Sequence, residues 1–385
     1  MRVLMLSTPF HTHFTPMVPL ACALRAAGHE VLVAGQPEVV DAAHSAGLCT
    51  ASVGERFHAN DVLSRKLRPG VRPLQVAGPA TPAMLAAGSR IWEMHAKYLL
   101  PTYLDLARSW GADLIVSEQM EFTGPIIGAV LGVPAVRHRW GIDALTGPTR
   151  ESVRLFLAGA CERLGLPGFP EDSRWLDPCP PPLQVPDLVR GIPIRPSTFN
   201  GAGEMPGWAF EPGSARRVCV CLGRQTLKLN GIGLLRGIVA AFDGLSGVEA
   251  VVTVEPEFQE HYADAPANVR IVDPTPLDLI LGNCAAVVHH GGASIAMAAA
   301  SYGIPQLTLP QFMDQFTVGE RVVATGVGRS IGTAEQQDDP AVVRDNLRAL
   351  LDDPGHERAA ADVRAATAAM PSPAQVAGDL ERLAA

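Results

Sequence analysis

The sequence lacks the features that would assign it to a membrane or secreted class. No stretch reaches the roughly 18 uninterrupted apolar residues of a membrane-spanning helix. The apolar run near the N-terminus is short and is broken by Pro9, and no A-x-A cleavage pattern follows it, so we expect no signal peptide. These absences predict a cytoplasmic protein without a membrane segment.

The sequence also lacks a set of cysteines suited to disulfide bonds, and it has no excess of positive charge. The seven cysteines are scattered, and their odd number argues against a disulfide framework. Cys219 and Cys221 lie in a strand-like run without a second pair at zinc-binding spacing, so we interpret the cysteines as reduced thiols. The formal net charge of −8 argues against nucleic acid or anionic membranes as partners. A single small anionic ligand at a local site remains compatible with that charge.

What the sequence does contain is a recurring strand–helix–strand pattern. A short apolar run at residues 2–7 precedes a helix for which Thr15 is the predicted N-cap and Pro16 the first residue. The pattern returns at residues 113–134 and again beyond residue 217. Such alternation is typical of parallel sheets covered on both faces. The predicted fold class is α/β, with two Rossmann-like, doubly wound parallel-sheet domains facing a cleft.

A stretch rich in glycine and proline at residues 191–217 marks the best domain boundary. We therefore predict a first domain, a linker, a second domain and a C-terminal helix that packs back on the first domain, at residues 1–200, 201–217, 218–370 and 371–385. Two segments of the first domain, 55–90 and 145–190, have little strand character. We interpret them as binding loops.

The segment A-A-V-V-H-H-G-G-A-S predicts a strand that ends at His289 and a helix that begins near Ser294. Between them, Gly291 and Gly292 let the backbone approach a ligand, and the helix N-terminus favours a phosphate. The imidazole of His290 adds a hydrogen-bond donor. The alternative is a tight turn with a buried histidine, and the motif alone does not separate the two.

Polar residues follow two further strands of the second domain. Asp314 and Gln315 come after the next strand along the chain, and a carboxylate beside an amide suits the vicinal hydroxyls of a sugar. Gly223 and Arg224 end the first strand of this domain. Arg224 either pairs with a diphosphate or is an exposed loop residue.

Five segments in order carry a family resemblance. They are R-V-L-M-L-S-T-P-F-H-T-H-F-T-P at the N-terminus, G-V-P-A-V-R-H-R-W-G at 132–141, I-R-P-S-T-F-N-G-A-G-E-M-P-G-W at 194–208, the block 272–319 and M-P-S-P-A at 370–374. Together they resemble the GT-B glycosyltransferases that decorate antibiotics and related natural products with nucleotide-activated deoxysugars, usually dTDP-linked. The resemblance covers most of the chain except 55–90 and 145–190.

The resemblance implies that His13 is the general base. A histidine just before a helix N-terminus also stays neutral and basic, which suits that role. His11 is a competing candidate. The segment D-L-I-V-S-E-Q places Glu118 where the family usually has an aspartate that orients the histidine, although a solvated loop-end carboxylate is the alternative reading. Pro274 lies where the family packs the nucleobase.

One departure from the family concerns the donor loop. Where the family commonly has G-T or N-S after H-G-G-x, this chain has Ser294 followed by Ile295. An isoleucine cannot hydrogen-bond a phosphate oxygen, so we expect Ser294 to supply that bond. The same departure leaves open a catalytically silent homologue that only binds the sugar nucleotide.

The sequence therefore predicts an inverting, metal-independent transfer of a deoxyhexose from a dTDP-sugar to a hydroxyl of a polyketide or macrolide-type aglycone. No D-x-D pair follows a strand, and the glycine-rich segments 201–207 and 231–237 lack dinucleotide-binding spacing, so we expect no cofactor beside the dTDP-sugar co-substrate. The predicted partners are that donor and a hydrophobic aglycone, and a homodimer stays open. C-glycosylation of an aromatic polyketide and a sugar-nucleotide epimerase are the remaining alternatives.

Overall fold

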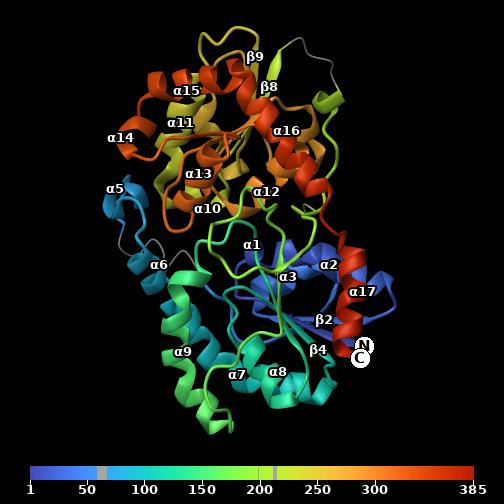
Figure 1. The fold of residues 1–385 in the computed structure, drawn as a ribbon. Helices are drawn as coiled ribbons and strands as arrows, with labels where there is room; N and C mark the ends of the chain where they lie inside the picture. Colours follow the sequence, from blue (N-terminus) through green and yellow to red (C-terminus); the bar gives the residue numbers. More distant parts are fainter. Residues whose placement is uncertain (59–66, 198, 211–214) are drawn as a thin grey trace.

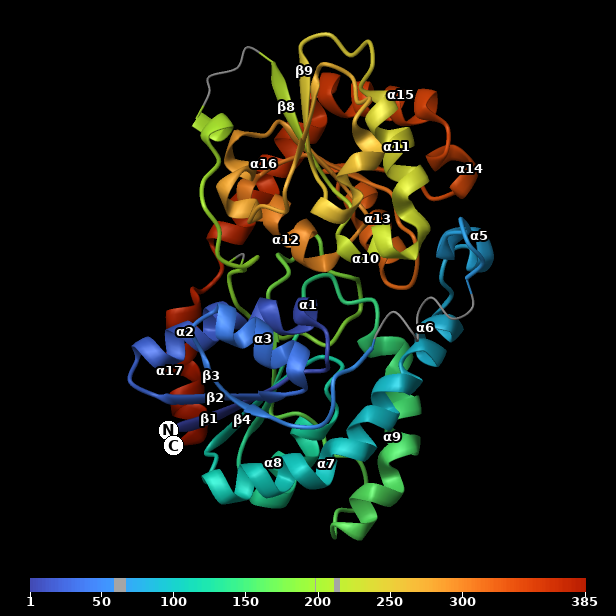
Figure 2. The ribbon, with the colours of Figure 1, turned by 180° about the vertical axis from the view of Figure 1, so that it is seen from behind.

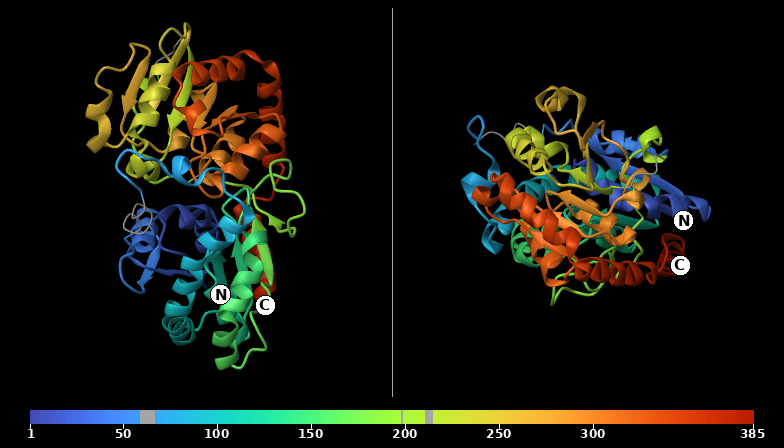
Figure 3. Two further views of the ribbon diagram at one scale, coloured as in Figure 1. Left: turned by 90° about the vertical axis from the view of Figure 1, so that its left-hand side faces the viewer. Right: turned by 90° about the horizontal axis from the view of Figure 1, so that it is seen from above.

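Two separate parallel sheets form the framework of the molecule. The computed structural model describes residues 1–58, 67–197, 199–210 and 215–385. One sheet has seven strands and the other has six, and the strand pairs of both are parallel. The two sheet domains lie one above the other in Figures 1 and 3. The predicted two-domain α/β architecture is confirmed.

The N-terminal sheet has the strand order β3-β2-β1-β4-β5-β6-β7. Its strands are β1 (Arg2–Leu6), β2 (Glu30–Gly35), β3 (Cys49–Ser52), β4 (Leu114–Glu118), β5 (Ala135–His138), β6 (Arg174–Asp177) and β7 (Ile192–Pro193). The order reverses between β1 and β4, and ligands of such sheets bind beside the carboxyl ends of the strands at this point. The residues that follow β1 and β4 are therefore brought together.

Helices cover both faces of this sheet. One face carries α1 (His11–Phe14), η1 (Thr15–Met17), α2 (Val18–Ala26), α3 (Pro37–Ser45) and α17 (Pro373–Ala384), and the other carries α7 (Arg90–Trp110), α8 (Thr123–Leu131) and α9 (Thr146–Arg163). Strand β1 alternates between the two cores: Val3 and Met5 pack on the α2 side, and Leu4 and Leu6 pack on the α7 side. The short helices α5 (Pro73–Ala77) and α6 (Pro82–Gly88) precede α7.

The C-terminal sheet has the order β10-β9-β8-β11-β12-β13. Its strands are β8 (Arg216–Cys221), β9 (Val248–Thr253), β10 (Val269–Val272), β11 (Ala286–His289), β12 (Gln306–Thr308) and β13 (Gly328–Ser330). The helices of this domain are α10 (Arg224–Thr226), η3 (Leu227–Gly231), α11 (Ile232–Ala241), η4 (Pro256–Tyr262), η5 (Leu277–Leu279), η6 (Leu281–Asn283), α12 (Ala293–Tyr302), α13 (Gln315–Ala324), α14 (Ala334–Gln337), α15 (Pro340–Asp352) and α16 (Pro354–Ala368), and η2 (Gly207–Phe210) lies on the segment that leads into it.

The chain crosses between the domains at two neighbouring places. The backbone N–H of Arg195, in the first crossing, donates to the carbonyl of Pro371 in the second, with an N···O distance of 2.7 Å. After the second crossing, α17 returns to the N-terminal domain, where Val376 and Leu380 pack in the same core as Leu20 of α2. Both chain termini consequently lie on the N-terminal domain (Figures 1 and 2).

Two sequence interpretations are wrong in detail. Thr15 does not cap a helix, because the helical segment already begins at His11 with Phe10 as its N-cap, and Thr15 lies inside it. The segment 145–190 is not mainly a loop, since it contains the 18-residue helix α9 and strand β6. The predicted loop 55–90 contains α5 and α6, and its residues 59–66 lie outside the described part of the chain.

Within the described residues, no helix combines the length and the apolar character needed to cross a bilayer.

Candidate active site

Thr8 and Glu118 meet at the carboxyl ends of β1 and β4. Because Leu6 of β1 pairs with Ser117 of β4, the residues just beyond these positions are neighbours. The Thr8 hydroxyl donates to Glu118 Oε1 over 2.6 Å, and the Thr8 backbone N–H donates to the same oxygen over 3.2 Å. The backbone N–H of Met120 donates to Oε2 over 2.7 Å, so both oxygens of this buried carboxylate are hydrogen-bonded. The alternative reading of Glu118 as a solvated loop-end group is wrong.

His13 lies on α1, directly above this pair. Its Nδ1 is 2.6 Å from the Thr8 hydroxyl oxygen and 3.9 Å from Glu118 Oε1. The predicted histidine and carboxylate are thus brought together, and the threonine hydroxyl lies between them. Sequence reasoning missed Thr8, although its place just after the first strand was a usable signal.

Burial sets the protonation states of both groups. It lowers the pKa of His13 to about 3, with a smaller contribution from neighbouring His11. The ring is neutral because it is desolvated and not, as we expected, because it precedes a helix N-terminus. Burial also raises the pKa of Glu118 to about 7, against the hydrogen bonds from Thr8 and Met120 that favour the carboxylate.

Aromatic side chains surround His13. The Trp140 ring stacks on it with a centroid distance of 3.8 Å and an interplanar angle of 28°. Trp92 of α7 approaches edge-on at 5.8 Å, Phe10 lies at 5.0 Å, and Phe57 packs on Phe10 at 5.9 Å. His13 therefore faces an apolar wall built from widely separated parts of the N-terminal domain, which sequence spacing does not reveal.

In the C-terminal domain, His289 supports the turn from inside the core. The fully buried ring accepts a hydrogen bond at Nδ1 from the backbone N–H of Gly291 over 3.1 Å. Its Nε2 must then carry the hydrogen, and it lies 3.0 Å from Gln306 Oε1. Both nitrogens of the His289 ring and the Gly291 N–H are already hydrogen-bonded. His289 and Gly291 therefore shape the turn, and a ligand would contact neighbouring residues.

The ring of His290 fits between two glycines. A Cβ at Gly223 would lie 3.0 Å from His290 Cε1, and a Cβ at Gly292 would lie 2.7 Å from His290 Nε2. Burial lowers the pKa of His290 to about 4, against a smaller effect of the Cys221 backbone that favours the protonated ring. The turns after β8 and β11 thus hold one neutral imidazole at the N-terminus of α12.

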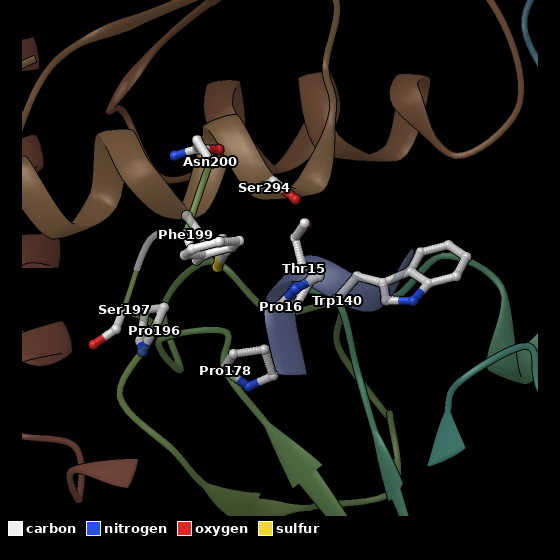
Figure 4. A pocket seen from close by; sticks show the side chains of 10 residues that line it. Thr15, Pro16, Trp140, Pro178, Pro196, Ser197, Phe199, Asn200 and Ser294 are labelled. Atoms are coloured by element: carbon white, nitrogen blue, oxygen red, sulfur yellow. The ribbon is translucent and has the colours of Figure 1, made fainter. Parts of the chain in front are cut away.

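A pocket lies between the domains at this helix end. Ser294 of α12 and Thr15 of η1 point toward each other across it, and Asn200 enters from the linker (Figure 4). Ile295, in contrast, is only 6% exposed and packs in the core with Leu277. The isoleucine that departs from the family pattern therefore points away from the pocket, and Ser294 lines it.

The loop between β12 and α13 packs against the same turn. A Cβ at Gly291 would lie 2.7 Å from the carbonyl oxygen of Gln315. The Gln315 side-chain oxygen accepts from the backbone N–H of Gln311 over 2.8 Å, so it holds the loop together. Met313 adopts a left-handed φ of 53°, and Asp314 follows as the N-cap of α13. Burial raises the pKa of Asp314 to about 6.

The last two predicted residues lie near the edges of the donor side. Arg224 Nε is 3.3 Å from Glu255 Oε1, and its side chain is 59% exposed. Desolvation and, to a smaller extent, the positive charge of Arg224 lower the pKa of His11. Pro274 is exposed just after β10, while the neighbouring Pro276 packs against Gly203 of the linker.

A buried arginine joins the domains at the rim of the site. Arg72 precedes α5 in the N-terminal domain, and its Nη1 donates to the side-chain oxygens of Gln311 and Gln337, each over 2.9 Å. Its Nη2 pairs with Asp338. Gln311 belongs to the loop that carries Asp314, so Arg72 connects a predicted acceptor segment to the donor loop. Figures 1 and 2 show α5 beside α14 of the other domain.

Comparison with known families decides the assignment. The profile described as Erythromycin biosynthesis protein CIII-like, N-terminal domain, matches residues 22–223, and the profile for the C-terminal domain of the same family matches residues 236–383. The chain belongs to this family. The resemblance inferred from the sequence is thereby confirmed, and the protein is a glycosyltransferase.

Individual relatives agree with this assignment. The chain is 34% identical to an L-demethylnoviosyl transferase of Streptomyces niveus, covering 99% of this chain and 97% of the relative. It is 31% identical to 3-alpha-mycarosylerythronolide B desosaminyl transferase of Saccharopolyspora erythraea, covering 100% and 99%. These relatives are named as transferases of deoxysugars.

Solved structures show the same two-domain GT-B architecture. The spinosyn rhamnosyltransferase SpnG superposes with a TM-score of 0.89 at 37% identity, covering 99% of this chain and 100% of that chain. Two further SpnG structures contain thymidine diphosphate and spinosyn aglycone, respectively.

Proposed function

We propose that this glycosyltransferase moves a deoxyhexose from a dTDP-sugar to a hydroxyl group of a polyketide or macrolide-type aglycone, with inversion at the anomeric carbon and without a metal ion. The observation that carries the proposal is a neutral His13 that is backed by a buried carboxylate and stacks on Trp140, which lines the interdomain pocket together with Ser294 of α12. The thymidine diphosphate and the macrolide acceptors of its relatives support the choice of substrates.

The N-terminal half of the site supplies the base. In the proposed reaction, His13 Nε2 takes the proton of the acceptor hydroxyl while the acceptor oxygen forms its bond to the anomeric carbon. The bond from that carbon to the diphosphate oxygen breaks on the opposite side, which inverts the configuration. The apolar rings of Trp92, Trp140 and Phe57 favour a hydrophobic aglycone beside the base.

The C-terminal half stabilises the leaving group. The N-terminus of α12, Ser294 and His290 offer dipoles and hydrogen bonds where negative charge grows on the departing diphosphate. We assign the sugar hydroxyls to Asp314, and we assign thymine to the backbone near Pro274. Because the proposed neutralisation comes from protein dipoles, turnover should survive chelation of divalent ions.

Donor binding is tested by thermal unfolding with dTDP and with UDP. At 100 times Kd, dTDP should stabilise the wild type by about 2.7 kcal/mol. His290→Ala should lose most of this stabilisation because the ring that lies between Gly223 and Gly292 is gone. His44→Ala, an exposed change on α3, is the matched control and should respond like the wild type. Equal responses of all three proteins to dTDP would remove His290 from the donor site.

The reaction itself is tested with dTDP-deoxysugars and a panel of macrolide and aromatic polyketide aglycones. The proposal predicts a product whose anomeric configuration, measured by NMR coupling constants, is opposite to that of the donor, in buffer with or without EDTA. His13→Ala should lower the turnover rate by about 100-fold or more. A retained configuration, or activity that disappears with EDTA and returns with Mg²⁺, would overturn the proposed mechanism.

A further inference from the structure

The feature that the family pattern does not explain is the hydroxyl group between the base and its carboxylate. His13 Nδ1 and Glu118 Oε1 are 3.9 Å apart, which is too far for a direct hydrogen bond. Thr8 Oγ1 is 2.6 Å from each of them. The side chain of Thr8 is buried, so bulk water does not compete for these two bonds.

The direction of the two hydrogen bonds follows from counting hydrogens. A threonine hydroxyl has one hydrogen, and that hydrogen is donated to Glu118 Oε1. When Glu118 is ionised, its carboxylate also receives backbone N–H groups from Thr8 and Met120, so it acts as an acceptor at both oxygens. The hydroxyl oxygen is then available only as an acceptor toward His13. The hydrogen in that bond must come from His13 Nδ1.

We infer that Thr8 is a positioning residue which fixes the His13 ring in the tautomer with hydrogen on Nδ1 and a free lone pair on Nε2. This inference rests on the proposed role of His13 as the base. The lone pair required to accept the acceptor's proton is then always on the nitrogen away from Glu118. Once Nε2 is protonated, the same two bonds link the imidazolium to the carboxylate.

The surrounding side chains leave Thr8 as the group that orients the ring. Trp140 stacks on the imidazole face, and Trp92 and Phe10 are aromatic, so they restrict its tilt without selecting a tautomer. The titratable neighbours are His11 on the same helix and Glu118 beyond Thr8. His13 and Glu118 are therefore connected through two hydrogen bonds at the threonine oxygen.

The first test reads the tautomer without any substrate. Nitrogen-15 NMR of the histidine rings, assigned with His13→Ala, should show a protonated Nδ1 and an unprotonated Nε2 for His13 near neutral pH. Thr8→Ser should give the same pattern, and Thr8→Val should give a mixture of tautomers. A wild-type ring protonated on Nε2, or an unchanged pattern in Thr8→Val, would overturn the inference whether or not the proposed substrates are correct.

The second test compares the turnover of the same variants. Thr8→Val keeps the size of the side chain and the backbone N–H but removes the hydroxyl. Its kcat should fall by about 10- to 100-fold, the factor expected for losing one hydrogen bond to a charged group. KM for both substrates should stay close to the wild-type values. The acid limb of the kcat/KM profile should move to lower pH, because the imidazolium loses its acceptor.

The serine variant distinguishes an effect of the Thr8 hydroxyl on the His13 ring from an effect of side-chain packing. Thr8→Ser should recover most of the activity and the wild-type pH profile. Thr367→Val, which removes a buried hydroxyl from α16, is the matched control for the substitution itself. Equal impairment of Thr8→Ser and Thr8→Val would assign the effect to disturbed packing at this position and overturn the inference, as would full activity of Thr8→Val. Absence of wild-type turnover beside the expected tautomers would instead count against the proposed function alone.

Discussion

At the scale of single residues, four buried histidines share one electrostatic property. Burial lowers the pKa of His13 and His289 to about 3 and that of His138 and His290 to about 4. Each of them takes up a proton when the chain unfolds below pH 6.5. Below that pH the unfolded state therefore binds more protons than the folded state, so the stability due to each histidine is complete above pH 6.5 and decreases as the pH falls.

His289 offers a direct check of this linkage. His289→Asn keeps an acceptor for the Gly291 N–H but removes the titrating ring, so the variant should be less stable at pH 7.5 and should lose less stability on acidification. Between pH 6 and pH 4.5 the wild-type free energy of unfolding should fall more steeply, by about 1.4 kcal/mol per pH unit. Urea unfolding at several pH values measures the difference. Parallel curves for the two proteins would refute it.

Two buried carboxyl groups change the folding stability with pH in the opposite direction. Burial raises the pKa of Glu118 to about 7 and of Asp314 to about 6, so the folded state holds their protons more tightly than the unfolded chain does. Their contribution to stability decreases as the pH rises from their ordinary pKa values, 4.5 and 3.8, to about 7 and 6. The histidine effect is therefore measured as a difference between the wild type and His289→Asn, in which the carboxyl contributions cancel.

Site residues differ in how far the sequence predicts them. His13 and Glu118 could be selected because motifs fixed their places after parallel strands, and the structure brings them together. Thr8 was missed although it follows the first strand closely, because its role depends on a distance between two strand ends. The sequence shows that Ile295 cannot bind a phosphate, but only the packing shows that its side chain faces the core while Ser294, one residue earlier on the helix, lines the pocket.

At the scale of elements, two turns that carry Gly223 and Gly291 determine the donor side. Both glycines have positive φ angles, 73° and 86°, and both lie within contact distance of another part of the site. A side chain at either position would therefore add steric overlap to backbone strain. The turns after β8 and β11 and the loop before α13 consequently form one packed unit.

The packing of this unit is tested by comparing Gly291→Ala with Gly47→Ala, a change at a glycine that has no neighbouring atoms. The new Cβ would lie 2.7 Å from the Gln315 carbonyl, whereas a Cβ at Gly47, with a φ of 70°, meets nothing within 4 Å. Gly47→Ala should cost only the strain of a left-handed alanine, about 1–2 kcal/mol. Gly291→Ala should cost more and should also weaken the stabilisation by dTDP. Similar unfolding free energies and equal responses to dTDP for the two variants would contradict the packed unit.

Elements were predictable where local pattern and tertiary packing agree. The buried strands β1 and β11 appear as short apolar runs in the sequence: β1 ends one residue before the expected end at residue 7, and β11 ends at His289 as expected. Helix α9 was hidden because Gly147 and Pro148 begin it and its apolar residues are few. Its stability comes from Val153, Leu157 and Cys161 packing in the core beside α7, which the sequence does not display.

At the scale of the whole molecule, Arg72 is a buried polar connection between the two domains. Its side chain is 4% exposed, so its bonds to Gln311 and Gln337 are shielded from solvent. The side chain of Asn230 adds to the connection by donating to the carbonyls of Arg68 and Val71. The segment before α5 is thus held by the domain to which it does not belong in sequence.

Arg72→Ala should lower the free energy of unfolding by about 2 kcal/mol or more, because it leaves buried amide oxygens without their charged donor. Arg56→Ala is the control, since Arg56 makes exposed ion pairs with Glu38 and Asp41 that contribute about 1 kcal/mol or less. Chemical denaturation of both variants gives the comparison. Equal losses would show that the buried contact adds no stability beyond a surface ion pair.

The two neighbouring crossings of the chain, tied by the Arg195–Pro371 hydrogen bond, have a mechanical consequence. They act as a single hinge on the side of α17, whereas Arg72 holds the domains on the side of α5 (Figures 1 and 2). A rotation about that hinge parts the domains most widely at α5 and least at the linker. A bulky molecule would therefore have its widest passage at the Arg72 side, and that passage would open only when the contacts of Arg72 and Asn230 are released.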